Sequence, residues 1–491
     1  MISAIIAACG LAVSHGDTPQ AILSRARHVL GMDDPNGPVL VITSREATAH
    51  AFESDRMYPP YLTLIDDHST WIDPSTGVAR DSMTGAFGQS SLTLSDDRSA
   101  WSEHRASWAA AEQERALDPR LLIHTWSTAR DVHVAGRCVY RDYARVVLTR
   151  TGPYGPEQLF IDPKTGFVTK LDRIEPQYLW GQVHVEYVYN SWLLYGAGGF
   201  GGGDVLMPTS ATRVVDGIDE ITRSLDNVAR VPRDSAPSLV MPATGAASTI
   251  ETPGFLRPSP VDTVRLGPRT FVLANPGYNE IVSLIHDTVY VLDATQSEIR
   301  ARTDSTWIAR LFPGRHPVAL IVTDLAWPHV SGVRFWVASG ATIISRDMSR
   351  SFLERVVARR WRASPDKLET HRRALRFIPV HESLARSGIG LYAIDGAGSE
   401  GALMAYLPTD GVLWASDYVQ TLDAPALYTT EVYTAACRFG LAPAKVVAEH
   451  HPVADWSVLT EMVRRQPIAD YPPECVRTSG KSTSDPTTKL K

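Results

Sequence analysis

The chain has 491 residues, which is too long for one ordinary hydrophobic core and predicts two or three domains. Its hydrophobic content of 44% and charged content of 21% are typical of a soluble globular protein. The net charge of −6 gives no reason to expect a nucleic-acid partner. Beyond the N-terminus, no segment is long and apolar enough to predict a transmembrane helix.

Residues 1–18 are predicted to be an export signal. The first 14 residues are apolar, but they are too short to span a bilayer. Ile6-Ala-Ala-Cys9 is similar to a bacterial lipoprotein cleavage box, so lipid anchoring at Cys9 is an alternative to simple cleavage. A buried first helix is the alternative to export. We therefore expect a periplasmic or secreted protein.

Residues 19–245 are predicted to form an antiparallel, β-rich domain. A helix is expected first, because Ile22, Ala26 and Val29 share one helical face. Short alternating runs then follow, and residues 182–190 alternate as a strand with one wet face would. Residues 71–77 and 160–166 both match aromatic-Ile-Asp-Pro-x-Thr-Gly, which predicts two hairpin turns.

The leading helix, these hairpins and the succession of strands resemble periplasmic half-barrels of the lipoprotein-carrier type. The resemblance implies a curved antiparallel sheet covered by helices, with a concave apolar face. Such a face would accept a small-molecule or lipid-like ligand. The alternative is that the sheet only packs against the rest of the protein.

A linker is predicted at residues 246–259, within a stretch rich in Pro, Ser, Ala, Thr and Gly. A second domain is expected over residues 260–468. The remaining residues, 469–491, form a tail whose end is polar and of low complexity, and this tail is predicted to be partly disordered.

The second domain contains a series of apolar runs that end in polar residues. The run 289–292 ends at Asp293, the run 317–322 ends before Asp324, the run 411–416 ends at Asp417, and the run 445–448 ends before His450. A helix is predicted from Arg334 to Gly340. In order and spacing, these segments resemble the metallo-β-lactamase-fold metallohydrolases, which implies an αββα sandwich and an α+β fold class for the whole chain.

The same resemblance implies a metal site, but most of its ligands are changed. Asp324, Ala326, Pro328 and His329 stand where the family has His, His, Asp and His, and residues 391–408 contain no histidine. His329, Asp417 and His450 remain, and they could hold one ion with Asp324 as a fourth ligand. Asp293 is expected to orient the metal loop from the second shell of residues.

The predicted function is that of an exported hydrolase-like protein with at most one divalent metal ion, zinc being the first candidate, and with Asp324 as the catalytic carboxylate. The alternatives are a metal-free pseudoenzyme of this fold and an envelope protein that binds a lipid-like ligand. Ser399, in Ala397-Gly-Ser-Glu-Gly401, is the runner-up nucleophile. Fold analogy does not choose a substrate.

Overall fold

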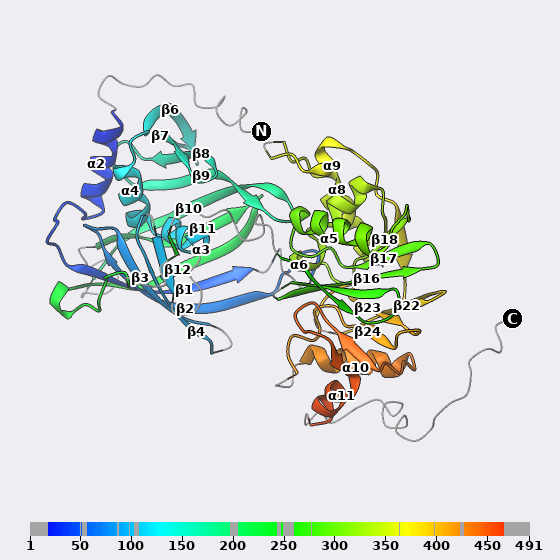
Figure 1. Cartoon of the computed structure of the whole chain (residues 1–491). Helices are drawn as coiled ribbons and strands as arrows, with labels where there is room; N and C mark the ends of the chain where they lie inside the picture. The colour runs from blue at the N-terminus through cyan, green and yellow to red at the C-terminus, as the bar shows by residue number, and fades with distance from the viewer. Residues whose placement is uncertain are drawn as a thin grey trace. The chain divides into compact units, whose positions relative to one another are not determined.

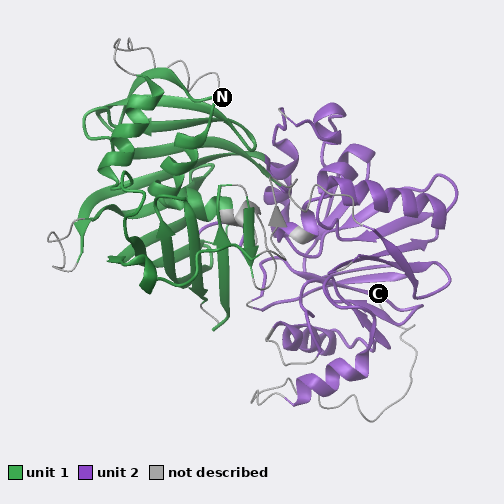
Figure 2. Cartoon of the chain, turned by 60° about the vertical axis from the view of Figure 1, so that its left-hand side comes forward, with its two compact units in different colours: residues 1–51, 61–177, 182–254 green, residues 52–60, 178–181, 255–491 purple. Residues whose placement is uncertain are grey.

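The structure is a computed structural model that describes residues 18–465 apart from 50, 52–55, 86–87, 98, 103–107, 197–204, 243–246, 249–259, 276, 363, 397 and 423–426. The chain forms two compact units (Figure 2). Unit 1 comprises Met1–Ala51, Tyr61–Gln177 and Gln182–Gly254, and unit 2 comprises Phe52–Pro60, Tyr178–Gly181 and Phe255–Lys491. Unlike the contiguous domains expected from the sequence, unit 2 thus includes two short segments from the first half of the chain. The predicted export signal and tail, and most of the linker, lie outside the described residues.

Unit 1 is built on a 13-stranded sheet in the order β13-β5-β4-β3-β2-β1-β12-β11-β10-β9-β8-β7-β6 (Figure 1). Its strands are β1 Val39–Ala49, β2 Thr63–Asp73, β3 Val78–Thr84, β4 Ser90–Ser95, β5 Ser99–Ser102, β6 His133–Tyr140, β7 Tyr143–Gly152, β8 Gly155–Ile161, β9 Val168–Gln177, β10 Gly181–Tyr195, β11 Val205–Val215, β12 Ile218–Val231 and β13 Ala247–Ser248. Most neighbouring strands of this sheet are successive in the chain, and β1 pairs antiparallel with both β2 and β12.

The two predicted hairpin turns are confirmed. In the β2–β3 turn, Asp73 Oδ1 accepts a hydrogen bond from the Ser75 amide, and Gly77 has a φ of 70°. In the β8–β9 turn, Asp162 Oδ1 accepts from the Lys164 amide in the same way. The short aspartate side chain therefore replaces backbone partners, and glycine supplies the left-handed conformation that closes the turn.

Among the described residues, three α-helices accompany this sheet: α2 Pro19–Val29, α3 Trp108–Leu117 and α4 Pro119–Thr128. The predicted first helix is confirmed, and the Thr18 hydroxyl caps it by accepting from the Ala21 amide. Helix α4 packs on the sheet, because Leu121 shares a buried cluster with Ile42 of β1 and Met207 of β11.

Unit 2 contains two further sheets and seven α-helices among its described residues. The 7-stranded sheet has the order β14-β15-β16-β17-β18-β19-β20 and the 6-stranded sheet the order β21-β22-β23-β24-β25-β26. The strands are β14 Asp262–Arg265, β15 Thr270–Asn275, β16 Tyr278–Ile285, β17 Thr288–Leu292, β18 Val318–Ile321, β19 Thr342–Arg346, β20 Phe377–Val380, β21 Ser383–Arg386, β22 Ile389–Ala393, β23 Leu403–Leu407, β24 Val412–Trp414, β25 Lys445–Val447 and β26 Ala454–Asp455. The helices are α5 Glu298–Leu311, α6 Trp327–Val330, α7 Val333–Ser339, α8 Arg350–Ala358, α9 Lys367–Thr370, α10 Leu427–Arg438 and α11 Trp456–Arg464.

The two sheets of unit 2 pack face to face between helices. One buried cluster joins Leu292 and Ile321 of the first sheet to Leu403 and Trp414 of the second. Alternate residues of the first sheet pack instead against α5, α7 and α8, and those of the second sheet pack against α10 and α11 (Figure 1). Since successive side chains of a strand point to opposite faces, each sheet has one buried face against the other sheet and one against helices.

A buried arginine ties α7 to the loops behind it. The Arg334 guanidinium donates to both carboxylate oxygens of Asp366, at 2.6 and 3.0 Å. It also donates to the backbone carbonyls of Val356, Val357 and Arg359 at the end of α8. All three guanidinium nitrogens of Arg334 therefore donate to an acceptor.

The structure confirms a mixed helix and strand protein with a large antiparallel sheet. The half-barrel character of unit 1 stays a prediction. Among the described residues, no helix combines the length and the apolar character needed to cross a bilayer.

Candidate functional site

The site of unit 2 is assembled where neighbouring strands end. Strands β17 and β18 run parallel with Leu292 opposite Ile321, and each is followed at once by a polar loop. The loop after β18 leads into α6, which includes His329, and then into α7, which ends at Gly340 in the left-handed conformation. The predicted strand–loop–helix order around His329 is confirmed.

His329 lies between two carboxylates. Its Nδ1 is 2.9 Å from Asp293 Oδ2, and its Nε2 is 2.9 Å from Glu449 Oε2. All three residues have a relative exposure of 0%. A carboxylate can only accept, so Nδ1 carries the hydrogen that is given to Asp293. If the ring is neutral, Nε2 then turns its lone pair toward Glu449.

Asp293 is itself held rigidly. It follows β17 with a φ of 69°, and its carboxylate accepts from the backbone amide of Thr323 at 2.6 Å and from the Thr323 hydroxyl at 2.5 Å. The indole Nε1 of Trp414 donates to it as well, at 3.1 Å. Asp293 therefore fixes the plane and the tautomer of the His329 ring.

The other side of the site comes from the ends of β24 and β25. These strands are parallel, with Trp414 opposite Val447, and the Glu449 amide donates to the Ser416 carbonyl at 3.0 Å. His450 Nε2 lies 3.2 Å from Asp417 Oδ1 and 3.3 Å from Glu449 Oε2. The side chains of Asp417 and His450 are 30% and 26% exposed, so this side of the site is open to solvent.

The second imidazole has the same orientation as the first. His450 Nδ1 donates to the backbone carbonyl of Gly277 at 2.6 Å, which leaves Nε2 facing the two carboxylates. His329, Asp417 and Glu449 each offer a ligand atom within 4.8 Å of the others. Within the described residues, His329 Nε2 and both carboxylate oxygens of Glu449 are buried without a hydrogen bond, because the 2.9 Å contact between them lacks hydrogen-bond geometry.

The charges of this cluster shift its protonation. Burial lowers the pKa of His329, but the carboxylates of Glu449 and Asp293 outweigh it and raise that pKa well above its usual value. Burial raises the pKa of Glu449 to about 7. Burial also lowers the pKa of His450, and the bond to Asp417 reverses this, so the net direction is upward. At neutral pH the cluster therefore holds protons that a cation could replace.

Asp324 lies beside this group. It is 3% exposed, and its Oδ1 accepts from the Ala326 amide at 2.8 Å. Burial raises the pKa of Asp324, and the charge of Asp417 adds to this, whereas His329 opposes it. A buried carboxyl of this kind can hold a proton at a higher pH than an exposed one.

Aromatic rings line the approach to His450. The Tyr278 ring centroid is 5.0 Å from that of His450 and 6.0 Å from that of Trp327, and Tyr178 lies 4.2 Å from Trp327. These rings give the site an apolar wall next to its polar centre.

The structure thus brings together Asp293, His329, Asp417 and His450, with Asp324 beside them. The sequence analysis did not predict Glu449 as a site residue. The available signal was its position, because Glu449 directly precedes His450 and follows an apolar strand. His451 does not join this group, and its Nδ1 donates to the Pro452 carbonyl at 2.7 Å. Ser399, the runner-up nucleophile, is 9% exposed.

No protein-family model matches the sequence, and no curated protein matches it. Solved metallo-β-lactamases are similar to part of the structure. The FIM-1 enzyme of Pseudomonas aeruginosa in its mono-zinc form is 11% identical, with a TM-score of 0.35 over 43% of this chain and 96% of that one. The enzyme of Hirschia baltica is 15% identical, with a TM-score of 0.34 over 42% and 97%. The enzyme of Pontibacter korlensis is 14% identical, with a TM-score of 0.33 over 42% and 100%. At these values the likeness indicates neither a substrate nor a metal for this chain.

Proposed function

We propose that unit 2 is a hydrolase that uses one divalent metal ion, held by His329, Glu449, Asp417 and His450. One observation carries the proposal: both imidazoles turn Nε2 toward carboxylate oxygens while Nδ1 donates elsewhere. Two lone pairs that face each other repel unless a cation lies between them. That cation is either a proton or a metal ion.

The donor set fits a metal ion. Two imidazole nitrogens and two carboxylates are a ligand combination that suits zinc, and it also suits ferrous iron or manganese. Among the described residues, the buried Nε2 of His329 and the Glu449 oxygens have no hydrogen-bond partner, as is expected of ligand atoms when the metal is not counted. Asp293 resembles the carboxylate that commonly orients a ligating histidine through its other nitrogen.

When bound, such an ion supplies Lewis acidity toward water and toward the oxygen of an electrophilic substrate. The chain's own residues would do the rest. Asp293 and the Gly277 carbonyl fix the two imidazole rings. Asp324, whose pKa is raised by burial, can hold a proton and deliver it to a leaving group. This role, rather than that of a fourth ligand, suits a carboxyl that burial favours in its neutral form.

The aromatic wall supports a substrate with an apolar portion. Tyr278 and Trp327 lie beside His450, so a small molecule could place its reactive carbonyl or phosphoryl group at the polar centre and its apolar part against the rings. This leaves lactams, thioesters, lactones and phosphodiesters as classes to assay.

An inactive protein of the same fold is the second candidate. The observation in its favour is that protonated His329 would pair with Asp293 on one side and Glu449 on the other without any metal. In that case the cluster is structural, and the protein binds a ligand without turnover.

Elemental analysis of protein purified without chelator distinguishes the two candidates. We expect metal at His329 and Glu449 in the parent protein, and we expect Glu449→Gln and His450→Gln each to remove one equivalent together with any hydrolysis of the four substrate classes. His451→Gln is the matched control, because its ring does not join the site. Equal metal content in parent and Glu449→Gln protein would favour the inactive candidate.

We also propose that the protein is exported. The apolar N-terminal segment supports this, and so does Cys437, which is disulfide-bonded. Disulfides persist in oxidising compartments such as the periplasm. Cell fractionation with an antibody to the chain tests the location, and recovery in the cytoplasmic fraction alone would refute it.

A further inference from the structure

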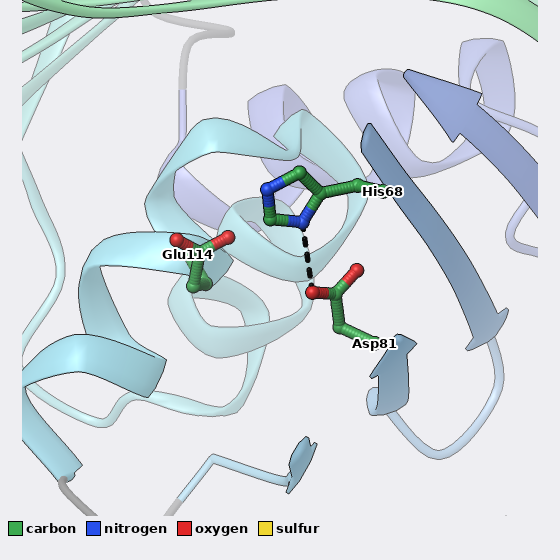
Figure 3. Close-up of side chains that lie close together, drawn as sticks. All are labelled: His68, Asp81 and Glu114. Atoms are coloured by element: carbon green, nitrogen blue, oxygen red, sulfur yellow. Dashed lines mark hydrogen bonds and ion pairs between the residues drawn. The ribbon is translucent and has the colours of Figure 1, made fainter. Parts of the chain in front are cut away.

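A second polar cluster lies within unit 1, on one face of its central strands. Alternate residues of β1, β2, β3 and β12 point to this face, and the strand register places them in directly opposed pairs: Glu46–Arg223, Ser44–His68 and Thr70–Asp81. Glu114 of α3 reaches the same place from the helix above (Figure 3). The cluster is therefore built by regular alternation rather than by a loop.

His68 presents a free nitrogen to Glu114. Its Nδ1 donates to Asp81 Oδ2 at 2.9 Å, and Asp81 Oδ1 accepts from the Thr70 hydroxyl at 2.6 Å. Figure 3 shows the second ring nitrogen on the side of Glu114. His68 is 8% exposed, and in the described part of the chain its buried Nε2 has no hydrogen-bond partner. The three residues offer ligand atoms within 4.8 Å of one another.

The fixed charges around His68 do not balance. Glu46, Asp81 and Glu114 are three carboxylates, and Arg223, which bonds to Glu46 at 2.5 Å and also contacts Glu114, is the one guanidinium shared among them. With His68 neutral and all three carboxylates ionised, the formal sum is two negative charges. Burial raises the pKa of Glu114. Burial lowers the pKa of His68, but the bond to Asp81 and the nearby carboxylates outweigh burial and raise that pKa, so protons offset this charge when no metal is bound. A divalent cation would neutralise both negative charges.

A comparable group in the same unit carries one negative charge fewer by the same count. Asp172, His184 and Glu186 also lie close together, but Lys170 Nζ pairs with Asp172 at 2.9 Å and with Glu186 at 2.6 Å. Among the described residues of the first cluster, no lysine takes that place. The two groups therefore differ in their need for a cation.

Space for an ion adjoins the cluster. A cavity of about 60 Å³ is lined by Ser44, Asp81, Glu114 and Arg223 together with apolar residues of the sheet. Ser44 is 2% exposed, and its buried hydroxyl has no hydrogen-bond partner among the residues that the structure describes. One water needs about 10–15 Å³ of such space, so an ion with a few waters fits.

We propose that His68, Asp81 and Glu114 form a second divalent-cation site, independent of the site in unit 2. His68 Nε2 and the Glu114 carboxylate contact the ion, and Asp81 holds the imidazole ring in the orientation that ligation requires. Waters in the cavity, one of them bonded to Ser44, complete the coordination. Nitrogen and oxygen donors of this kind select zinc or manganese over calcium.

Calorimetric titration of the full chain with zinc chloride tests this site. The background is the chain with Glu449→Gln and His450→Gln, which disables the site of unit 2. In this background we expect about one zinc per chain, and we expect His68→Gln or Glu114→Gln to weaken its binding by about 10-fold or more. His133→Gln, at an exposed histidine of the same sheet, should change nothing.

The outcomes separate the two sites. No zinc binding in the background overturns the second site, and so does zinc binding that is unaffected by Glu114→Gln. If the parent chain binds one zinc that His68→Gln removes and Glu449→Gln does not, the second site stands and the proposed function fails. Glu114 is 30% exposed, so Glu114→Gln decides the matter even if His68→Gln does not fold.

Discussion

Asp293→Ala should destabilise unit 2 strongly, because this carboxylate serves four buried donor groups. Two of them keep other partners: Trp414 Nε1 also lies 3.1 Å from the Thr323 hydroxyl, which in turn bonds to Ser416 at 2.8 Å. The Thr323 amide and His329 Nδ1 would lose the one acceptor that each has among the described residues. An unsatisfied buried donor costs about 1–3 kcal/mol, and breaking a buried ion pair costs about 3–5 kcal/mol. We therefore expect a loss of about 3–5 kcal/mol in urea unfolding.

Asp293→Asn separates this stability from metal binding. The asparagine oxygen can still accept from the Thr323 amide, so this variant should lose less stability than Asp293→Ala, although its amide group replaces Oδ2, the oxygen that the other three donors contact. Its amide group, however, would face His329 Nδ1 as a donor and favour the tautomer with hydrogen on Nε2. Loss of such an orienting partner lowers metal affinity by about 10–100-fold. Asp287→Asn, whose side chain is 78% exposed, is the control. Parent-like zinc affinity in folded Asp293→Asn protein would refute the assigned role of this carboxylate.

Three further outcomes follow from the same contacts. Metal affinity at the site of unit 2 should weaken as the pH is lowered from about 8 to about 6. The reason is that Glu449, whose pKa is raised to about 7, must lose its proton to bind a metal ion. Calorimetry at each pH measures this affinity, and a constant affinity would contradict the prediction. Arg334→Ala should lower the free energy of unfolding by about 3–5 kcal/mol, since it leaves the buried carboxylate of Asp366 unpaired. The control Arg350→Ala, at an exposed arginine, should change it by less than about 1 kcal/mol. Equal effects of the two variants in thermal unfolding would contradict this prediction. Trp414→Phe should cost about 1–2 kcal/mol by removing the bond to Asp293 while filling most of the same space, and an unchanged melting temperature would rule that out.

Local pattern was enough to predict the framework of the site. The strand at 318–321, the helix at 333–339 and the polar residues after each strand all follow from short-range periodicity and turn chemistry. Glu449 was missed for a physical reason. In a regular strand, neighbouring residues point to opposite faces, so choosing His450 implied that Glu449 faced away. Strand β25 ends at Val447, and the chain bends at 449–450, so that both side chains reach the same place.

Long-range pairing could not be predicted in the same way. The central pair of unit 1 joins β1 to β12, which are far apart in sequence, and a bulge between Thr43 and Ser44 shifts its register. No local sequence pattern predicts that Glu46 lies opposite Arg223, so the acidic cluster of unit 1 could not be predicted from the sequence. Hairpins, by contrast, bring neighbours together through their own turns.

The discontinuity of unit 2 has a consequence for how the chain is made. Met57 and Leu179 are buried in the core that contains α7 and α8, and Tyr178 lies against Trp327, two residues before His329. These residues leave the ribosome long before the strands and helices that cover them. Their apolar side chains therefore stay exposed until more than about a hundred later residues have been synthesised. A truncated chain beginning at residue 260 would lack them altogether. Such a fragment should aggregate, and it would lose the Tyr178 ring of the aromatic wall, even though every proposed metal ligand is present.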